Sequence, residues 1–322
     1  MTMKRYQQIL SLGVTSAIAL SAFAAKAGDV DASKAVVTAP LVDPWADTIR
    51  PISNPTLFDL AIPQTQIHPL FIHNRMPDTV DTILGKVPVG GDFQVYAMQV
   101  EIALNERLSI NAVKDGYIDF NPDSTLTTSD GWANIEAGLK YAWLLQPEQG
   151  LASNFQLQYE IPTGNADVWQ GEGDGILTPS MSVLKLLGKF QVADQFGFRL
   201  PIDDSESSVF YNSVHVSYKL TDWLFPLAEV NVFHVMDAGD GSARFPSQVG
   251  GLVPAIAKFE GGDLVNLGAS NTVSNFVSLA LGARVRIPDS PIDLGFAWEF
   301  PLTDQDNGLM EDRFTVDMVI RF

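Results

Sequence analysis

The last nine residues, 314–322, alternate between apolar and mostly polar side chains. The apolar positions are Phe314, Val316, Met318, Ile320 and Phe322. Side chains repeat every two residues only in a β-strand, so the pattern predicts a strand with one apolar face. At the open edge of a soluble sheet, such a strand would invite aggregation. In a closed barrel within a lipid bilayer, it pairs on both sides and its apolar face contacts lipid.

Similar strand patterns recur from residue 66 onward. We expect twelve strands, over residues 66–73, 92–104, 107–119, 130–145, 151–162, 176–187, 193–202, 208–220, 223–236, 272–287, 291–301 and 312–322. An even number suits a bacterial single-chain barrel that has both ends on the periplasmic side. The sequence therefore predicts an all-β fold over residues 66–322: a transmembrane, antiparallel, up-and-down β-barrel of about 12 strands in the outer membrane.

The connections between these strands alternate between short and long. The short ones are 105–106, 146–150, 188–192, 221–222 and 288–290. The long ones are 74–91, 120–129, 163–175, 203–207, 237–271 and 302–311. Outer-membrane barrels show this alternation, with short periplasmic turns and longer external loops.

Parity along each strand separates a lipid face from a lumen face. Between Phe155 and Ile161, for example, every second residue is a large apolar one, and the residues between them are Gln156, Gln158 and Glu160. A Lys or Arg on the lipid face costs about 2–4 kcal/mol near the midplane, so charged residues should face inward. The expected lumen-lining residues are Glu101, Glu136, Lys140, Glu160, Arg199, His215, Lys219, Glu229, Arg284, Arg286 and Glu299. The same parity would turn Trp132 and Trp223 inward.

The first 65 residues precede the expected barrel. Residues 1–27 combine a basic start, an apolar run and Ala25-Lys26-Ala27, which predicts a secretory signal peptide. Residues 28–65 contain five prolines, which disfavour a helix or an inner strand. We expect an extended, Pro-rich periplasmic lead-in. Its apolar residues Trp45, Leu57, Phe58 and Leu60 leave open a second possibility, docking in the barrel mouth or lumen.

Charge and cysteine content narrow the possible partners. The net charge is −18, and loss of residues 1–27 would remove three cations and no acid, giving −21. Such a charge disfavours nucleic acid as a partner. The chain contains no Cys, which excludes disulfides and a lipid anchor on cysteine. Acidic groups in the external loops are either simply solvated or could bind Ca²⁺ or Mg²⁺ that bridges to lipopolysaccharide; we expect no other cofactor.

Catalysis finds little support in the sequence. Ser213, His215 and Ser217 share one strand face, and some outer-membrane barrels are hydrolases. Residues two apart on a strand, however, are about 7 Å apart, too far for a direct hydrogen bond between nucleophile and base. The four His residues do not show a metal-ligand spacing, so the metal remains unassigned. We therefore expect a protein that is not an enzyme.

Short motifs in the second half of the chain resemble a known family. The strand exit Tyr159-Glu160-Ile161-Pro162-Thr163-Gly164-Asn165, the Gly-rich stretch 171–175 and the hairpin 218–229 are similar to an outer-membrane barrel family. That family is linked to phenol meta-pathway degradation clusters. The resemblance covers about residues 131–322. It implies a transporter for small, hydrophobic or aromatic solutes, without assigned catalytic residues.

Two further expectations follow for a Gram-negative outer membrane. A final Phe after an alternating strand is similar to the signal that outer-membrane barrels present to the barrel-assembly machinery, so Phe322 should be an assembly signal. Lipids and lipopolysaccharide would then surround the barrel. For function, the sequence leaves two alternatives: a narrow pore for small solutes, or a structural or hydrolase-type barrel with a plugged lumen.

Overall fold

The computed structural model describes residues 44–82, 85–239, 263–266, 275–303 and 309–322. The expected signal peptide lies outside these residues, and so does the lead-in as far as residue 43. Two one-turn 3₁₀ helices, η1 (Pro147–Gln149) and η2 (Ala166–Val168), are the helical elements of the described chain. None of the described helices is long and apolar enough to cross a membrane.

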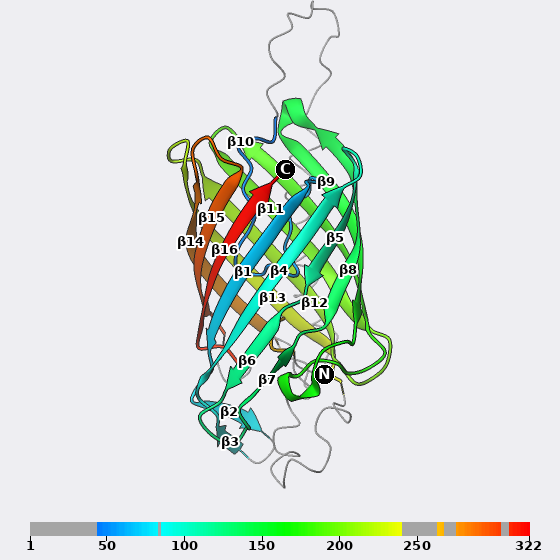
Figure 1. Cartoon of the computed structure of the whole chain (residues 1–322), viewed down its shortest axis with the longest axis vertical. Coiled ribbons are helices and arrows are strands. Elements are labelled where there is room, and N and C mark those ends of the chain that lie inside the picture. Colours follow the sequence, from blue (N-terminus) through cyan, green and yellow to red (C-terminus); the bar gives the residue numbers. More distant parts are fainter. Residues whose placement is uncertain (1–43, 83–84, 240–262, 267–274, 304–308) are drawn as a thin grey trace, which may run out of the picture. The chain divides into compact units, whose positions relative to one another are not determined.

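Twelve antiparallel strands form a closed barrel, as the sequence predicted (Figure 1). Each strand pairs with its neighbours along the chain, and β1 also pairs with both β4 and β16, which closes the wall. In chain order the wall strands are β1 (Gln66–Arg75), β4 (Asp92–Ala103), β5 (Leu108–Lys114) continued by β6 (Tyr117–Asn121), β7 (Ser129–Trp132) continued by β8 (Ile135–Gln146), β9 (Leu151–Ile161), β10 (Ile176–Leu187), β11 (Phe190–Pro201), β12 (Ser208–Tyr218), β13 (Leu224–Asp237), β14 (Asn275–Arg286), β15 (Ile292–Pro301) and β16 (Asp312–Arg321).

The two ends of the barrel differ. The short connections and Phe322 lie at one end, which we call the turn end; the other, the loop end, carries the long connections (Figure 1). A small separate hairpin, β2 (Thr79–Thr82) and β3 (Gly85–Pro88), belongs to the loop end. At the turn end, the backbone N–H of Phe322 donates to the carbonyl of Thr65, 3.0 Å away. The end of β16 is therefore joined to the start of β1.

Apolar side chains cover the outside of the wall and polar side chains fill its inside. On β9, Phe155 and Leu157 are 53% and 57% exposed, whereas Gln156 and Glu160 are 3% and 1% exposed. The exposed apolar residues are those that contact lipid in a membrane barrel. The period-two alternation of the sequence therefore corresponds to the two faces of the wall.

One interruption in the wall changes the parity that the sequence suggested. β5 and β6 are separated at Gly116, whose φ of +115° favours glycine, and a Cβ there would lie 2.5 Å from the carbonyl oxygen of Tyr96. β7 and β8 are separated at the same level, where Ala133 N–H donates to the carbonyl of Gly116. Ala133 and Asn134, which lie between β7 and β8, are both buried, so the alternation breaks there and Trp132 faces outward, 62% exposed. Trp223 is also exposed because it lies in a turn before β13. The inward expectation for both was wrong.

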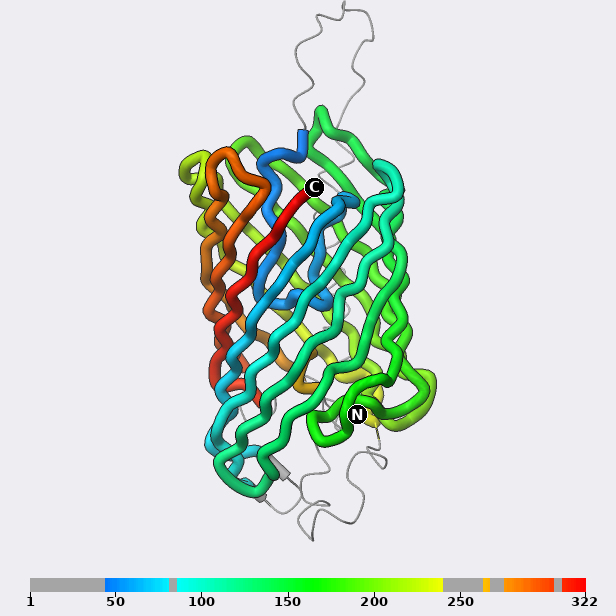
Figure 2. Tube along the Cα trace, in the orientation of Figure 1, coloured from blue at the N-terminus to red at the C-terminus, as the bar shows by residue number. Residues whose placement is uncertain are grey.

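The described part of the Pro-rich segment, residues 44–65, lies inside the barrel, and we call it the plug. Figure 2 shows it running inward from the turn end, reversing near the middle and returning to β1. A turn closed by Leu57 N–H and the carbonyl of Asn54 lies between its two arms. Residues 48–62 are all buried. This part of the chain therefore does not form the extended periplasmic lead-in that we expected; it occupies the alternative position, in the lumen.

Candidate functional site: the closed lumen

The plug carries an ion pair of its own, and wall charges surround it. Arg50 Nη1 lies 2.7 Å from Asp59 Oδ1, so the pair joins the two arms of the plug. Lys140 of β8 forms ion pairs with Asp59 and, at 2.9 Å, with Glu101 of β4. All four side chains are buried. Buried charges are tolerated when they are paired, so this cluster fixes the plug against β4 and β8.

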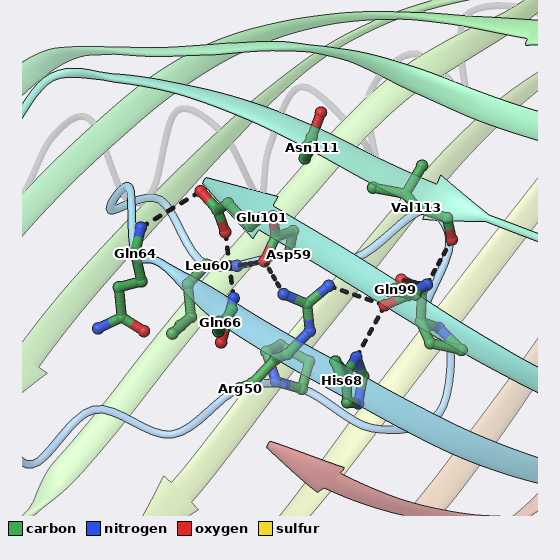
Figure 3. A network of polar contacts seen from close by, with 12 residues as sticks. Arg50, Asp59, Leu60, Gln64, Gln66, His68, Gln99, Glu101, Asn111 and Val113 are labelled. Atoms are coloured by element: carbon green, nitrogen blue, oxygen red, sulfur yellow. Dashed lines mark hydrogen bonds and ion pairs between the residues drawn. The ribbon is translucent and has the colours of Figure 1, made fainter. Parts of the chain in front are cut away.

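Polar side chains of β1 and β4 complete this cluster (Figure 3). Arg50 Nη2 donates to Gln99 Oε1 at 3.0 Å, and the same oxygen is hydrogen-bonded to His68 Nδ1 at 2.8 Å. Gln66 donates to Glu101 at 3.1 Å. The cavity between these groups measures about 10 Å³, at most enough room for one water molecule. The plug and the wall are therefore packed tightly together here.

Arg284 of β14 binds both the wall and the plug. Its guanidinium donates to both carboxylate oxygens of Asp317 on β16, at 2.9 and 2.7 Å. Its Nε donates to the backbone carbonyl of Arg50 at 3.0 Å. Gly295 of β15 provides the room, because a Cβ at that position would lie 2.0 Å from Asp317 Oδ1. A wall ion pair thus supplies a hydrogen bond to the plug backbone.

Glu229 of β13 accepts the backbone donors of the plug just before its turn. The N–H groups of Ile52 and Ser53 lie 3.0 and 2.7 Å from its carboxylate oxygens. His215 of β12 is hydrogen-bonded to the same carboxylate through Nδ1, at 2.7 Å. Since backbone donors that are buried need acceptors, Glu229 satisfies two donors that no sheet pairing satisfies here.

Glutamine side chains and apolar contacts hold the rest of the plug. Gln191 of β11 accepts from the N–H of Ile49 and donates to its carbonyl, at 2.9 and 2.7 Å, as a neighbouring strand would. In one apolar cluster, plug residues pack against the inner faces of β9, β10 and β11. Its members are Phe58, Leu60, Ala61, Ile62, Ala152, Leu184 and Ala193. The plug is therefore bound by polar and apolar contacts.

A second segment, residues 263–266 of the connection between β13 and β14, also lies buried among the lumen residues. Asp263 Oδ2 lies 2.6 Å from Lys114 Nζ and 3.2 Å from Arg199 Nη2. Its Oδ1 accepts from Gln170 Nε2 at 2.9 Å. Although burial opposes ionisation, the cations of Lys114 and Arg199 hold the pKa of Asp263 well below its usual range. The carboxylate is therefore ionised at neutral pH.

Glu160 of β9 lies beside the same two cations. One of its oxygens is 2.5 Å from Lys114 Nζ and the other is 2.8 Å from Arg199 Nη2. Asn134 also donates to it, at 2.7 Å. Lys114 and Arg199 therefore each bind one wall carboxylate and one carboxylate of the inserted segment.

The inserted segment and the plug meet inside the barrel. Thr56 of the plug and Asn266 are joined by a side-chain hydrogen bond. Leu264 and Val265 belong to an apolar cluster that includes Leu57 of the plug and side chains of the inner wall. The wall and loop members that we use below are Phe120, Trp169, Phe233 and Phe276. Two chain segments thus fill the lumen.

The residues expected to line the lumen fall into two groups. Lys219 and Arg286 lie half-buried at the turn end, where Lys219 pairs with Asp47 and Arg286 donates to the carbonyl of Ala46. The others are buried inside the barrel: Glu101, Glu136, Lys140, Glu160, Arg199, His215, Glu229, Arg284 and Glu299. The plug separates them into local clusters, so they do not form one ring.

Several residues of the closed lumen were not on the expected list. Arg50 and Asp59 lie in the Pro-rich segment, and Asp263 lies in a long loop, where no period assigns a face. Lys114 was missed for another reason: the register of β5 against β8 shifts between Ala112 and Lys114, which reverses the parity. A buried lysine just before a glycine-containing break has no signature in the sequence pattern.

The described residues contain no cluster that could hold a metal ion, and Ser213 and His215 do not pair with each other. No group of three or more His, Asp or Glu side chains converges on one point in the described ranges. Asp240, Asp304 and Asp306, which belong to the acidic loop groups, lie outside those ranges. Ser213 Oγ donates to Asn231 and His215 binds Glu229, so the expected serine and histidine have different partners.

A closed barrel of twelve antiparallel strands with an apolar exterior and a polar interior defines a transmembrane β-barrel of the outer-membrane type. No family model matches the sequence, and a search of curated proteins finds no significant match. Among solved structures, the chain is similar to an outer membrane channel from Pseudomonas putida F1, with a TM-score of 0.55 and 12% identity over 81% of this chain and 96% of that one. The NanC porin gives a TM-score of 0.47 and 6% identity, over 80% of this chain and 100% of that one. At such identities the likeness concerns the fold.

Proposed function

We propose that this protein is an outer-membrane channel for small apolar or aromatic solutes, held closed by its own plug. The observation that carries the proposal is that chain segments, and not the side chains of the wall, fill the lumen. An eight-stranded barrel is filled by its own side chains, whereas a barrel of sixteen strands leaves a wide channel. Twelve strands lie between these sizes. Withdrawal of the plug, with release of residues 263–266 that contact it, would therefore leave a path along the lumen.

Apolar side chains inside the loop end support an apolar solute. Phe120 and Trp169 meet edge to face with ring centroids 5.9 Å apart, and Phe233 and Phe276 form a second pair at 6.2 Å. Binding sites for small molecules combine such apolar walls with a few polar groups. The sequence resemblance to the family linked to phenol degradation is in accord with an aromatic solute, and the fold of the Pseudomonas putida channel is in accord with transport.

Removal of the plug tests this function. In planar bilayers, the full chain should show rare or small unitary currents, because the plug and residues 263–266 are buried inside the barrel. A variant that lacks residues 46–62 should show steady currents at least about tenfold larger, as an empty lumen of this strand number predicts. Glu148→Gln, at an exposed position of the short connection between β8 and β9, serves as the control and should leave the small currents unchanged. A silent plug deletion that still folds as a barrel would refute the proposal.

The alternative is a structural barrel with a permanent plug, and the paired buried charges favour it. Breaking a buried ion pair is costly, so the cluster around Lys140 opposes plug release. The same recordings decide between the two functions, because a permanent plug predicts no openings of the native chain at any voltage. A hydrolase-type function has no support from the Ser213 and His215 contacts.

We further propose that the barrel resides in the outer membrane of a Gram-negative bacterium. Its exposed apolar residues would contact lipid, and its loop end would face lipopolysaccharide. Bridging of acidic loops to lipopolysaccharide by Ca²⁺ or Mg²⁺ and recognition of Phe322 by the barrel-assembly machinery belong to the same proposal. The apolar outer face supports the membrane location.

A further inference from the structure

Asp263 is bound inside the barrel in the way that a protein binds a foreign carboxylate. Its two oxygens accept from Lys114, Arg199 and Gln170, which come from β5, from β11 and from the connection between β9 and β10. They also accept from Val265 and Asn266 of its own segment, and a free carboxylate would lack these contacts. Lys114 and Arg199 are only 1% and 2% exposed. Two cations and an amide that converge on one carboxylate form a specific recognition site, since charge-assisted hydrogen bonds are the strong ones.

The residues that follow Asp263 extend the comparison. Leu264 is completely buried and Val265 is 5% exposed, and both pack in the apolar cluster that contains Trp169 and Phe120. The segment thus presents a carboxylate to the cationic pair and an apolar body to an aromatic surface directly beside it. These are the two chemical features of a small aromatic or aliphatic carboxylic acid.

The charges around this site favour an anion. When Asp263 is set aside, Lys114 and Arg199 keep Glu160 as their shared wall partner. Glu136 and Glu206 also act electrostatically on Arg199, but the ion pairs that Asp263 makes with Lys114 and Arg199 are lost when it leaves. Buried donors without an acceptor are unfavourable, so an anion that replaces Asp263 restores these contacts. A neutral solute could occupy the apolar surface but would not restore the two ion pairs.

We propose that Lys114, Arg199 and Gln170, together with the adjoining apolar cluster, form a binding site for small carboxylates with an apolar body, which residues 263–266 occupy in the closed protein. This deepens the proposed function, because it names the class of solute that enters from the loop end. The solute carboxylate and Asp263 compete for the same donors. Binding of the solute therefore displaces residues 263–266 and breaks the contact between Asn266 and Thr56 of the plug.

Binding of benzoate to the purified full chain in detergent tests the site by calorimetry, with benzamide as the neutral probe of the same shape. Asp263→Asn removes the competing charge and keeps the side-chain size. Benzoate affinity should rise at least about tenfold in this variant, because hydrogen bonds to charged groups are worth that much. Benzamide affinity should not change. Asp289→Asn, in an exposed turn, is the matched control and should bind benzoate as the native chain does.

The cationic pair is tested in the Asp263→Asn background. Lys114→Met should abolish the gain in benzoate affinity, and Lys114→Arg should retain most of it. A second measurement leaves Asp263 intact: the chain has no Cys, so Asn266→Cys gives a single buried thiol. Benzoate, and not benzamide, should speed its labelling by a maleimide several-fold. This measurement tests the proposal even where a charge variant fails to fold.

Two results would overturn the proposal: equal benzoate affinity in the native and Asp263→Asn chains, or labelling of Asn266→Cys that benzoate does not change. Neither assay requires current through the barrel. If benzoate does not bind but the plug deletion conducts, the proposed carboxylate site is refuted and the proposed channel function is supported. If benzoate binds but the plug deletion does not conduct, the carboxylate site is supported and the channel function is refuted.

Discussion

At the scale of single residues, the lumen is organised by buried charges, many of which meet an opposite charge. Lys140 pairs with Asp59 and Glu101, and Arg284 pairs with Asp317. The sequence predicted that Lys140, Glu101 and Arg284 face inward, because charged side chains on the lipid face are costly. It could not predict which charges meet. Lys140 forms ion pairs with Asp59 of the plug and Glu101 of β4, and not with Glu136 of its own strand.

Replacement of Lys140 tests how strongly this cluster stabilises the fold. Lys140→Met leaves Asp59 with one partner and Glu101 without its cation, and both carboxylates stay buried. Because loss of one partner strands a buried charge, the free energy of unfolding should fall by about 3–5 kcal/mol. Guanidinium unfolding in detergent micelles measures the change. Lys189→Met, at an exposed position of the turn between β10 and β11, is the control; equal stability of both variants would contradict the role of the cluster.

At the scale of elements, the period-two alternation of apolar and polar residues predicted the strands of the wall. It could not predict the fold of the plug or of the connections, which have no such period. All twelve wall strands were expected, and their observed bounds differ from the expected ones by a few residues. The plug has no period because its contacts are made by a folded-back, Pro-rich chain whose neighbours are three or more different strands. Its buried Arg50 and Asp59 resemble ordinary loop charges until the barrel surrounds them.

The strand β16 carries the prediction about assembly. Phe322 follows this strand, is 78% exposed and makes only a backbone contact to Thr65 among its described hydrogen bonds. Its side chain therefore adds little to the finished barrel, and Phe322→Asp should lower outer-membrane insertion severely while export continues. Cell fractionation with immunoblotting measures the inserted fraction. Phe322→Tyr should insert normally, and normal insertion of Phe322→Asp would show that this residue is no assembly signal.

At the scale of the whole molecule, the barrel is a closed wall around two inserted segments. The wall could be predicted from the sequence because each of its strands obeys the same two-sided constraint, lipid outside and polar lumen inside. The site could be predicted only in part, since Glu160 and Arg199 belong to wall strands, whereas Asp263 and Gln170 belong to connections. Contacts between a wall and its connections depend on how the connections fold back, which no local pattern records.

A closed barrel without an open sheet edge should resist detergent as one unit. The full chain, refolded in detergent, should migrate as a compact species in sodium dodecyl sulfate without heating and shift to its normal position on boiling, because every wall strand is paired on both sides. Circular dichroism should show β-structure before boiling. Identical migration before and after boiling, or a spectrum dominated by helix, would contradict the fold.

The reversal of the plug inside the lumen determines how the plug can leave the barrel and re-enter it. Both arms of residues 44–65 reach the same end of the barrel, and the second arm continues directly into β1. The plug is a loop inserted into the barrel from the turn end, so no chain end has to pass through the lumen. Withdrawal of the plug does not change the topology of the chain, and its return requires only that residues 44–65 refold inside the barrel. A pull on the first arm would unfold the plug from one side, residue by residue, while the seam between β1 and β16 stays sealed.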